Sequence, residues 1–301
     1  MTKDYLVRAL CFNDTIRAVA VTATGVVNEA HLAHDTWNTA TAALGRTLIA
    51  GLLLGSSQKG QEHMTIKVQG NGPIGTILVD ANAKGEVKGY AQNPHVSLPS
   101  NAQGKLDVRG AVGTEGSLTV IKDLGLKEPF VGQVPLVSGE LGEDFTNYMA
   151  SSEQIPSAIG LSVLVDTDES VRAAGGFMIQ VMPGATEETI TEIEQRLAKL
   201  PFVSTLIDEG KTPEEILAAI LGEENMTILD REPVAFACDC SKEKFAQALT
   251  RIGGDALQEM IDEDEGAETV CHFCNSKYQF DKAELEELQK LAQVQEAEDE
   301  A

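Results

Sequence analysis

Four of the five cysteines in this 301-residue chain form two tight pairs near its C-terminus. One residue separates Cys238 from Cys240, and two residues separate Cys271 from Cys274. Two thiol pairs that converge on one point can form a closed tetrahedral zinc site, because zinc favours soft thiolate donors. We therefore predict that these four residues bind one Zn²⁺ per chain when they are reduced.

The same cysteines can close short-range disulfides, and a disulfide removes two ligands at once, so that the metal must leave. The proximity within each pair makes Cys238–Cys240 and Cys271–Cys274 the easiest bridges. The one-residue gap strains the first bridge and should make it readily reducible. Loss of zinc would then unfold the end of the chain, so the spacing predicts a redox switch.

Two other functions remain open for these cysteines. A zinc ribbon without a redox role would only stabilise its surroundings. A thiol–disulfide oxidoreductase is disfavoured because the Cys271 pair does not open a helix after a strand. His272 is interpreted as a bystander, since four thiolates already fill a tetrahedral shell. Cys11 lies in an apolar run and is expected to be a buried core thiol.

Three further motifs have simpler structural interpretations. Residues 70–75 match the G-x-G-x-x-G dinucleotide string, but Pro73 and the β-branched residues that follow it predict a hairpin. His31 and His34 have a metal-like spacing, although we interpret them as the N-terminal edge of a helix. Asp166 and Asp168 are expected to lie in a solvated turn.

The charge and hydropathy of the chain exclude several classes of partner. The formal net charge is −24, with 47 acidic against 23 basic residues, and such a surface repels nucleic acid phosphates and anionic lipid. The most apolar stretch, residues 44–54, is too short to span a membrane and contains Arg46. With no signal peptide evident, we expect a cytoplasmic protein whose thiols are kept reduced.

The element pattern predicts an α+β protein with three parts. Residues 1–184 form a mixed α/β core, residues 185–236 a helical linker, and residues 237–301 a small zinc-binding redox domain. The core contains helices at about 35–54 and 143–152, and strands at 5–12, 16–22, 64–69, 74–80, 87–92, 117–122, 161–166 and 171–182.

The linker is acidic and amphipathic, with too few apolar residues to hold a core of its own. Thr212, Pro213 and Glu215 predict a capped helix start, and Gly222 ends that helix. We expect this segment to depend on a neighbour and to be metastable. The redox domain has few large apolar side chains, so we expect it to need a bound metal ion for stability.

This arrangement resembles the 33 kDa chaperonin family, the redox-regulated holdase chaperones of the bacterial heat-shock response. Besides the cysteine spacing, Glu143–Tyr148, Ser152–Ala158 and Gly175–Ala185 are similar to segments of that family's core domain. The resemblance implies a non-enzymatic protein that is inactive while zinc occupies Cys238, Cys240, Cys271 and Cys274.

The resemblance also implies how such a protein is activated. Hypochlorite, or peroxide with heat, forms the two disulfides and expels zinc. The linker then unfolds and homodimers form. The dimers bind unfolding client proteins without ATP, and later pass them to ATP-dependent foldases.

Overall fold

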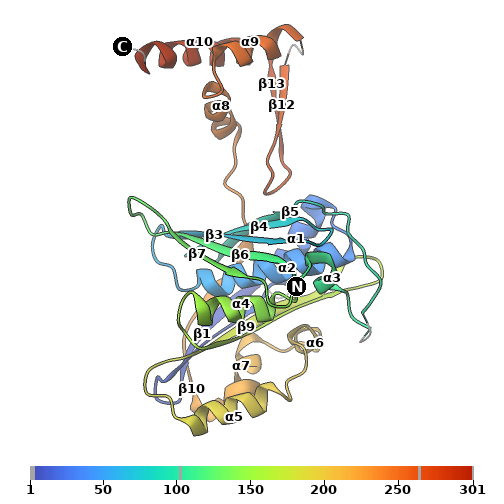
Figure 1. Cartoon of the computed structure of the whole chain (residues 1–301), viewed down its shortest axis with the longest axis vertical. Coiled ribbons are helices and arrows are strands. Elements are labelled where there is room, and N and C mark those ends of the chain that lie inside the picture. Colours follow the sequence, from blue (N-terminus) through green and yellow to red (C-terminus); the bar gives the residue numbers. More distant parts are fainter. Residues whose placement is uncertain (1–3, 102–103, 264–265, 300–301) are drawn as a thin grey trace. The chain divides into compact units, whose positions relative to one another are not determined.

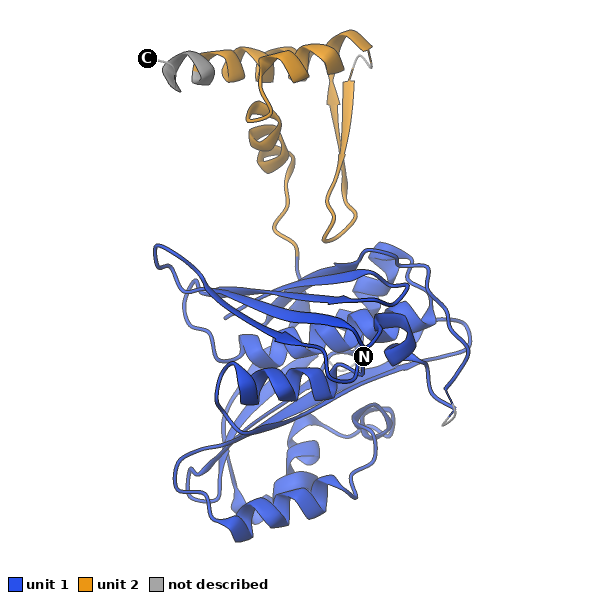
Figure 2. Ribbon diagram, viewed as in Figure 1, with its two compact units in different colours: residues 1–237 blue, residues 238–301 orange. Residues whose placement is uncertain are grey.

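The computed structural model describes residues 4–101, 104–263 and 266–299, with side chains described as far as residue 294. The chain divides into two compact units, Met1–Ala237 and Cys238–Ala301, which are coloured separately in Figure 2. Helices and strands both contribute to each unit, and the predicted α+β class is confirmed.

The first unit contains a five-stranded sheet in the order β10-β1-β2-β9-β8, with every neighbouring pair antiparallel. Its inner strands β2 and β9 are mostly apolar and buried because both faces of the sheet are covered. The strands are β1 (Tyr5–Cys11), β2 (Ile16–Thr22), β8 (Ser157–Val165), β9 (Val171–Val181) and β10 (Met226–Pro233).

A second sheet of six strands has the order β11-β5-β4-β3-β6-β7. Only the short β11 is parallel to its neighbour, and the other pairs are antiparallel. The turn between β3 and β4 contains residues 71–75, which confirms the predicted hairpin. The strands are β3 (His63–Gly70), β4 (Thr76–Asn82), β5 (Glu86–Ala91), β6 (Gly116–Asp123), β7 (Phe130–Pro135) and β11 (Ala235–Phe236).

Helix α2 (Asn38–Gly55) lies between the two sheets and contacts strands of both (Figure 1). It is buried on nearly every side, as its uniformly apolar composition requires. Small residues allow this close packing: a Cβ atom on Gly45 would lie 2.7 Å from Cγ1 of Val27. The other helices of this region are α1 (Thr24–His34), α3 (Val108–Val112) and α4 (Gly142–Ser151).

The opposite face of the five-stranded sheet is covered by α5 (Glu187–Leu197), α6 (Val203–Asp208) and α7 (Pro213–Leu221). Alternate residues of β2 show the two faces: Val19 belongs to the core around α2, whereas Ala18 belongs to the core under these helices. The acidic segment therefore packs on a neighbour, as expected. We call residues 187–221 the helical segment.

The expectation that residues 185–235 are wholly helical is wrong for their last part. After a short 3-10 turn at Glu223–Asn225, Met226–Pro233 forms the edge strand β10 and pairs with β1. The β-branched Thr227 and Ile228 are soon followed by the polar residues Asp230 to Glu232 and by a proline, so the local pattern does not predict a strand. Tertiary pairing overrides a weak local preference here.

Other differences from the sequence analysis have similar causes. Helix α1 was not predicted, since it contains Gly25 and the β-branched Val26 and Val27, which are poor helix formers. Consequently, His31 and His34 lie in the last turn of α1, so their assignment to a helix N-terminus is wrong. Strand β7 was also missed, because it ends in proline, which sheets tolerate at an edge.

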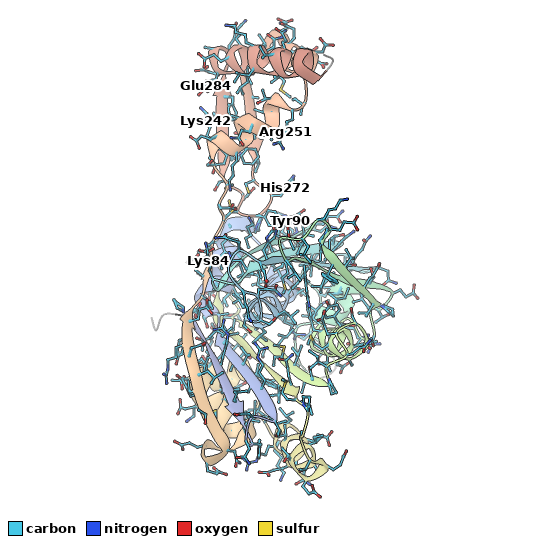
Figure 3. All side chains as sticks on the ribbon, turned by 90° about the vertical axis from the view of Figure 1, so that its left-hand side faces the viewer. Lys84, Tyr90, Lys242, Arg251, His272 and Glu284 are labelled. Atoms are coloured by element: carbon cyan, nitrogen blue, oxygen red, sulfur yellow. The ribbon has the colours of Figure 1, made fainter. Side chains whose placement is uncertain are left out.

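The second unit has a small core of its own. Six residues form it: Leu249, Leu257, Ile261, Phe280, Leu285 and Ala292. Lys242 of α8 and Glu284 of α10 join two of its helices by an ion pair of 2.5 Å (Figure 3). The elements are α8 (Lys242–Thr250), α9 (Gly254–Glu263), β12 (Gly266–Val270), β13 (Lys277–Asp281) and α10 (Lys282–Asp299).

Across the described ranges, none of the helices combines the length and the apolar character that crossing a membrane would require.

The helical segment is tied to the sheet by a polar contact at the start of α7. Thr212 caps this helix and Glu215 closes the predicted capping box. The neighbouring Glu214 accepts hydrogen bonds from the Tyr5 hydroxyl (2.7 Å) and from Nε of Arg231 (2.6 Å). Burial raises the pKa of Glu214, but these hydrogen bonds outweigh it and leave the pKa below its usual value.

We expect Glu214→Ala to lower the free energy of unfolding of the first unit by about 1 kcal/mol, because the partly buried Tyr5 hydroxyl loses its acceptor. Since the folded-state pKa is lowered, the contribution is present above the unfolded-state pKa and is lost as pH falls through the folded-state pKa. Urea unfolding followed by Trp37 fluorescence should therefore show the largest difference near neutral pH. The exposed Glu209, changed to alanine, is the control; an equal loss in both variants would contradict the assignment.

Candidate metal centre

The four paired cysteines lie on two loops of the second unit. Cys238 and Cys240 belong to the irregular segment between β11 and α8. Cys271 and Cys274 lie in the turn that joins β12 to β13. The structure therefore brings together all four residues that the sequence singled out.

The sulfur atoms have the spacing of a tetrahedral metal site. All four lie within 4.8 Å of one another. The Sγ atoms of Cys238 and Cys271 are 3.7 Å apart, and those of Cys240 and Cys274 are 3.3 Å apart. A tetrahedron with zinc–sulfur bonds of about 2.3 Å has edges of about 3.8 Å. The four residues could thus hold a metal ion, and their donor set fits zinc.

The turn between β12 and β13 explains why Cys271 and Cys274 converge. The Asn275 amide donates to the carbonyl oxygen of Cys271 (2.7 Å), and the Cys271 amide donates to that of Ser276 (2.9 Å). Asn275 has a φ of 59°, a left-handed conformation in which asparagine is favoured among non-glycine residues. Backbone hydrogen bonds therefore close this knuckle and bring Cys271 and Cys274 together.

The four thiols differ in their electrostatic surroundings. Burial raises the pKa values of Cys238 and Cys271. Burial also acts on Cys274, but hydrogen bonds with the side chain and backbone of Ser276 outweigh it and lower the pKa of Cys274 to about 7. Cys274 therefore reaches the thiolate form most readily among these three. Metal binding must displace the remaining protons, which makes it dependent on pH.

Tyr278 is a polar neighbour of the site that the sequence analysis missed. Its hydroxyl oxygen lies 3.2 Å from Sγ of Cys240 and donates a hydrogen bond to the Cys240 carbonyl oxygen (3.1 Å). The hydrogen bond with Cys240 and burial raise the pKa of Tyr278 to about 12. Its position four residues after Cys274 was the only available signal, and that spacing specifies no contact by itself.

The remaining candidate residues lie elsewhere. Cys11 is 1% exposed in the sheet core, and burial raises the pKa of its thiol to about 11, which confirms the predicted core thiol. His272 is exposed on the knuckle. Within the described part of the chain, the four paired cysteines form the only group of three or more histidine, cysteine or acidic residues placed to hold a metal; His31 and His34 form none.

Comparison with known proteins identifies the family. The family model described as "Hsp33 protein" matches residues 4–281. A 33 kDa chaperonin of Enterococcus faecalis is 65% identical over 290 residues, which are 96% of this chain and 97% of that protein. One from Geobacillus kaustophilus is 56% identical over 289 residues, which are 96% of this chain and 98% of that protein.

The fold is also similar to a solved structure. The crystal structure of a 33 kDa chaperonin, also named heat shock protein 33 homolog, from Thermotoga maritima has a TM-score of 0.90 at 39% sequence identity. The match covers 96% of this chain and 98% of that chain. Together with the matches over nearly the whole sequence, this shows that the chain belongs to the Hsp33 family of chaperones.

Proposed function

We propose that this chain is a redox-regulated holdase that is zinc-bound and inactive when reduced, and disulfide-bonded and active when oxidised. The observation that carries the proposal is the convergence of four sulfur atoms within 4.8 Å in a unit whose own core is small. Membership of a chaperone family supports the client-binding role. The protein acts by binding and not by catalysis.

In the reduced protein, Cys238, Cys240, Cys271 and Cys274 hold one Zn²⁺. A structural zinc site in a small domain contributes about 10–16 kcal/mol at neutral pH. Six buried residues cannot stabilise the second unit to that extent. The metal therefore decides whether this unit is folded.

Oxidation by a peroxide forms two disulfides. In each, two thiolates supply two electrons, the O–O bond of the peroxide breaks, and two hydroxide ions are released. We assign the bridges as Cys238–Cys240 and Cys271–Cys274. The shortest sulfur contacts run between the pairs, but those depend on the fold. Proximity within each pair is set by the chain itself and persists when the metal leaves and the unit loosens.

To bind unfolding clients, the activated protein must also expose apolar surface that is buried in the reduced form. The helical segment buries Ile193, Ile216 and Ile220 against the five-stranded sheet. We propose residues 1–184 as the core, 185–236 as a metastable linker and 237–301 as the redox domain. Release of the linker would expose its apolar face and the sheet beneath it, and would free the edge of β1 now paired with β10. Unfolding client proteins and a second copy of the chain would bind there.

The cellular setting follows from the thiol chemistry. In the cytoplasm the thiols stay reduced until an oxidant appears, so the chaperone does not bind clients in unstressed cells. Clients held without ATP would pass to ATP-dependent foldases once the disulfides are reduced again. The net charge of −24 opposes binding to nucleic acid or anionic membranes.

The lowered pKa of Cys274, about 7, favours one alternative, a thiol–disulfide oxidoreductase. Steady turnover of a small disulfide substrate by the reduced protein would support that alternative. A zinc ribbon without a redox role would instead retain its metal in mild oxidant.

Light scattering of a heat-denaturing client tests the proposed function directly. We expect peroxide-treated protein to suppress aggregation at about equimolar ratio, and protein kept in reductant with zinc to have little effect. Adding a thiol reductant should reverse the activity. Equal suppression by both forms would rule out the switch.

Metal content tests the ligand assignment. We expect Cys271→Ser to lose most of its zinc, because a neutral hydroxyl replaces one thiolate of four. Cys11→Ala is the matched control, since it removes a cysteine that lies in the other unit, and it should retain one zinc per chain. Elemental analysis and a count of reactive thiols would measure both; a stoichiometric zinc content in Cys271→Ser would refute the site.

Destabilising the helical segment should ease activation. Ile220 is fully buried under the sheet, so Ile220→Ala should cost about 2–5 kcal/mol in the packing of this segment. We expect this variant to become active at lower temperature or lower peroxide concentration than the wild type. Ile66→Ala, equally buried in the core around α2, is the control. Identical activation thresholds in both variants would show that the segment has no special role.

A further inference from the structure

The hydroxyl of Tyr278 contacts Cys240 at two points. It lies 3.2 Å from the sulfur and 3.1 Å from the carbonyl oxygen of the same residue. Tyr278 belongs to β13, whereas Cys240 lies 38 residues earlier on the loop before α8. The contact therefore joins the two halves of the metal centre without using the metal.

The ring of Tyr278 is held by the fold of the second unit. Its centroid lies 5.2 Å from that of Phe245 on α8, with the planes tilted by 36°. Its backbone is opposite Thr269 in the β12–β13 ladder. In the folded unit, packing and strand pairing consequently set the position of the hydroxyl.

A hydroxyl in this position acts on a thiolate in a defined way. A metal-bound thiolate has no proton and can only accept, so in that state the Tyr278 hydroxyl shares its single proton between the Cys240 carbonyl oxygen and the Cys240 sulfur, both of which lie within reach. Donation to the sulfur withdraws charge and lowers its nucleophilicity. Ser276 occupies the corresponding position beside Cys274, at 3.2 Å. Among the described residues, no side-chain hydroxyl bonds to the sulfur of Cys238 or Cys271 in this way.

We infer that Tyr278 is a positioning residue that holds Cys240 in the metal centre and slows the reaction of its sulfur with oxidants. The inference rests on the proposed function. It adds a residue that helps to set the oxidant concentration at which zinc is released. The hydroxyl of Tyr278, and not its ring, is the group that slows the reaction of the Cys240 sulfur with oxidants.

The reaction that Tyr278 slows is a two-electron oxidation. A lone pair of the Cys240 sulfur attacks one peroxide oxygen, the O–O bond breaks and hydroxide leaves, so that the sulfur becomes a sulfenic acid. The Cys238 thiolate then attacks that sulfur and forms the S–S bond, releasing a second hydroxide. The hydrogen bond stabilises the thiolate more than the sulfenic acid, which raises the barrier of the first step.

Tyr278→Phe removes the hydroxyl and keeps the ring on Phe245. We expect this variant to bind one zinc per chain and to release it to peroxide about fivefold faster than the wild type. Alkylation followed by mass spectrometry should show the increase at Cys240. With Co²⁺ in place of zinc, the sulfur-to-metal charge-transfer band should move to lower energy, a change that loss of packing alone would not produce.

Controls separate this inference from the proposed function. Tyr148→Phe also removes a tyrosine hydroxyl, one that donates to Glu153 in the first unit and away from the helical segment, and should leave the rate of zinc release unchanged. If peroxide releases no zinc from the wild type, the redox function fails. If it releases zinc equally fast from the wild type and Tyr278→Phe, only the role of Tyr278 is overturned.

A second variant covers the case in which Tyr278→Phe cannot retain zinc. Site-specific 3-fluorotyrosine at position 278 preserves the ring and hydroxyl but makes the hydroxyl a stronger donor. We expect it to release zinc more slowly than the wild type. An unchanged or faster release would contradict the inference.

Discussion

The convergence of four thiols on one point is the constraint on which the second unit depends. Among the described residues, its helices and hairpin share a core of six buried apolar residues, which is small for fixing their arrangement by packing. The knuckle at Cys271 and Cys274 is closed by backbone hydrogen bonds of its own, which bring half of the ligand set together. The other half comes from an irregular loop and depends on contacts such as that of Tyr278.

The first unit has the opposite character, with two extensive sheets and a helix buried between them. The helical segment covers one face of the five-stranded sheet, opposite the face that packs on α2. That segment uses apolar contacts from short helices and a few polar contacts such as those of Glu214. It continues through β10 and β11, and β11 ends only two residues before Cys238. These two strands therefore connect the helical segment to the first two cysteines of the metal centre along the chain.

Much of this organisation could be predicted from sequence where local chemistry decides it. The cysteine spacing predicted the cluster, and Thr212, Pro213 and Glu215 predicted the start of α7. Prediction failed where distant pairing decides the outcome. Strand β10 exists because β1 offers it an edge, and Tyr278 reaches Cys240 because β12 and β13 pair. Neither partner can be identified from spacing along the chain.

A redox-sensitive zinc site must satisfy two opposing requirements. Four thiolates bind zinc tightly, yet the same charge makes each sulfur reactive toward oxidants. Hydrogen bonds to the sulfurs can change the reactivity without removing a ligand. Tyr278 beside Cys240 and Ser276 beside Cys274 place one hydroxyl on each cysteine pair. The oxidant threshold of such a site can therefore be adjusted by residues that never contact the metal, while the ligands themselves stay the same.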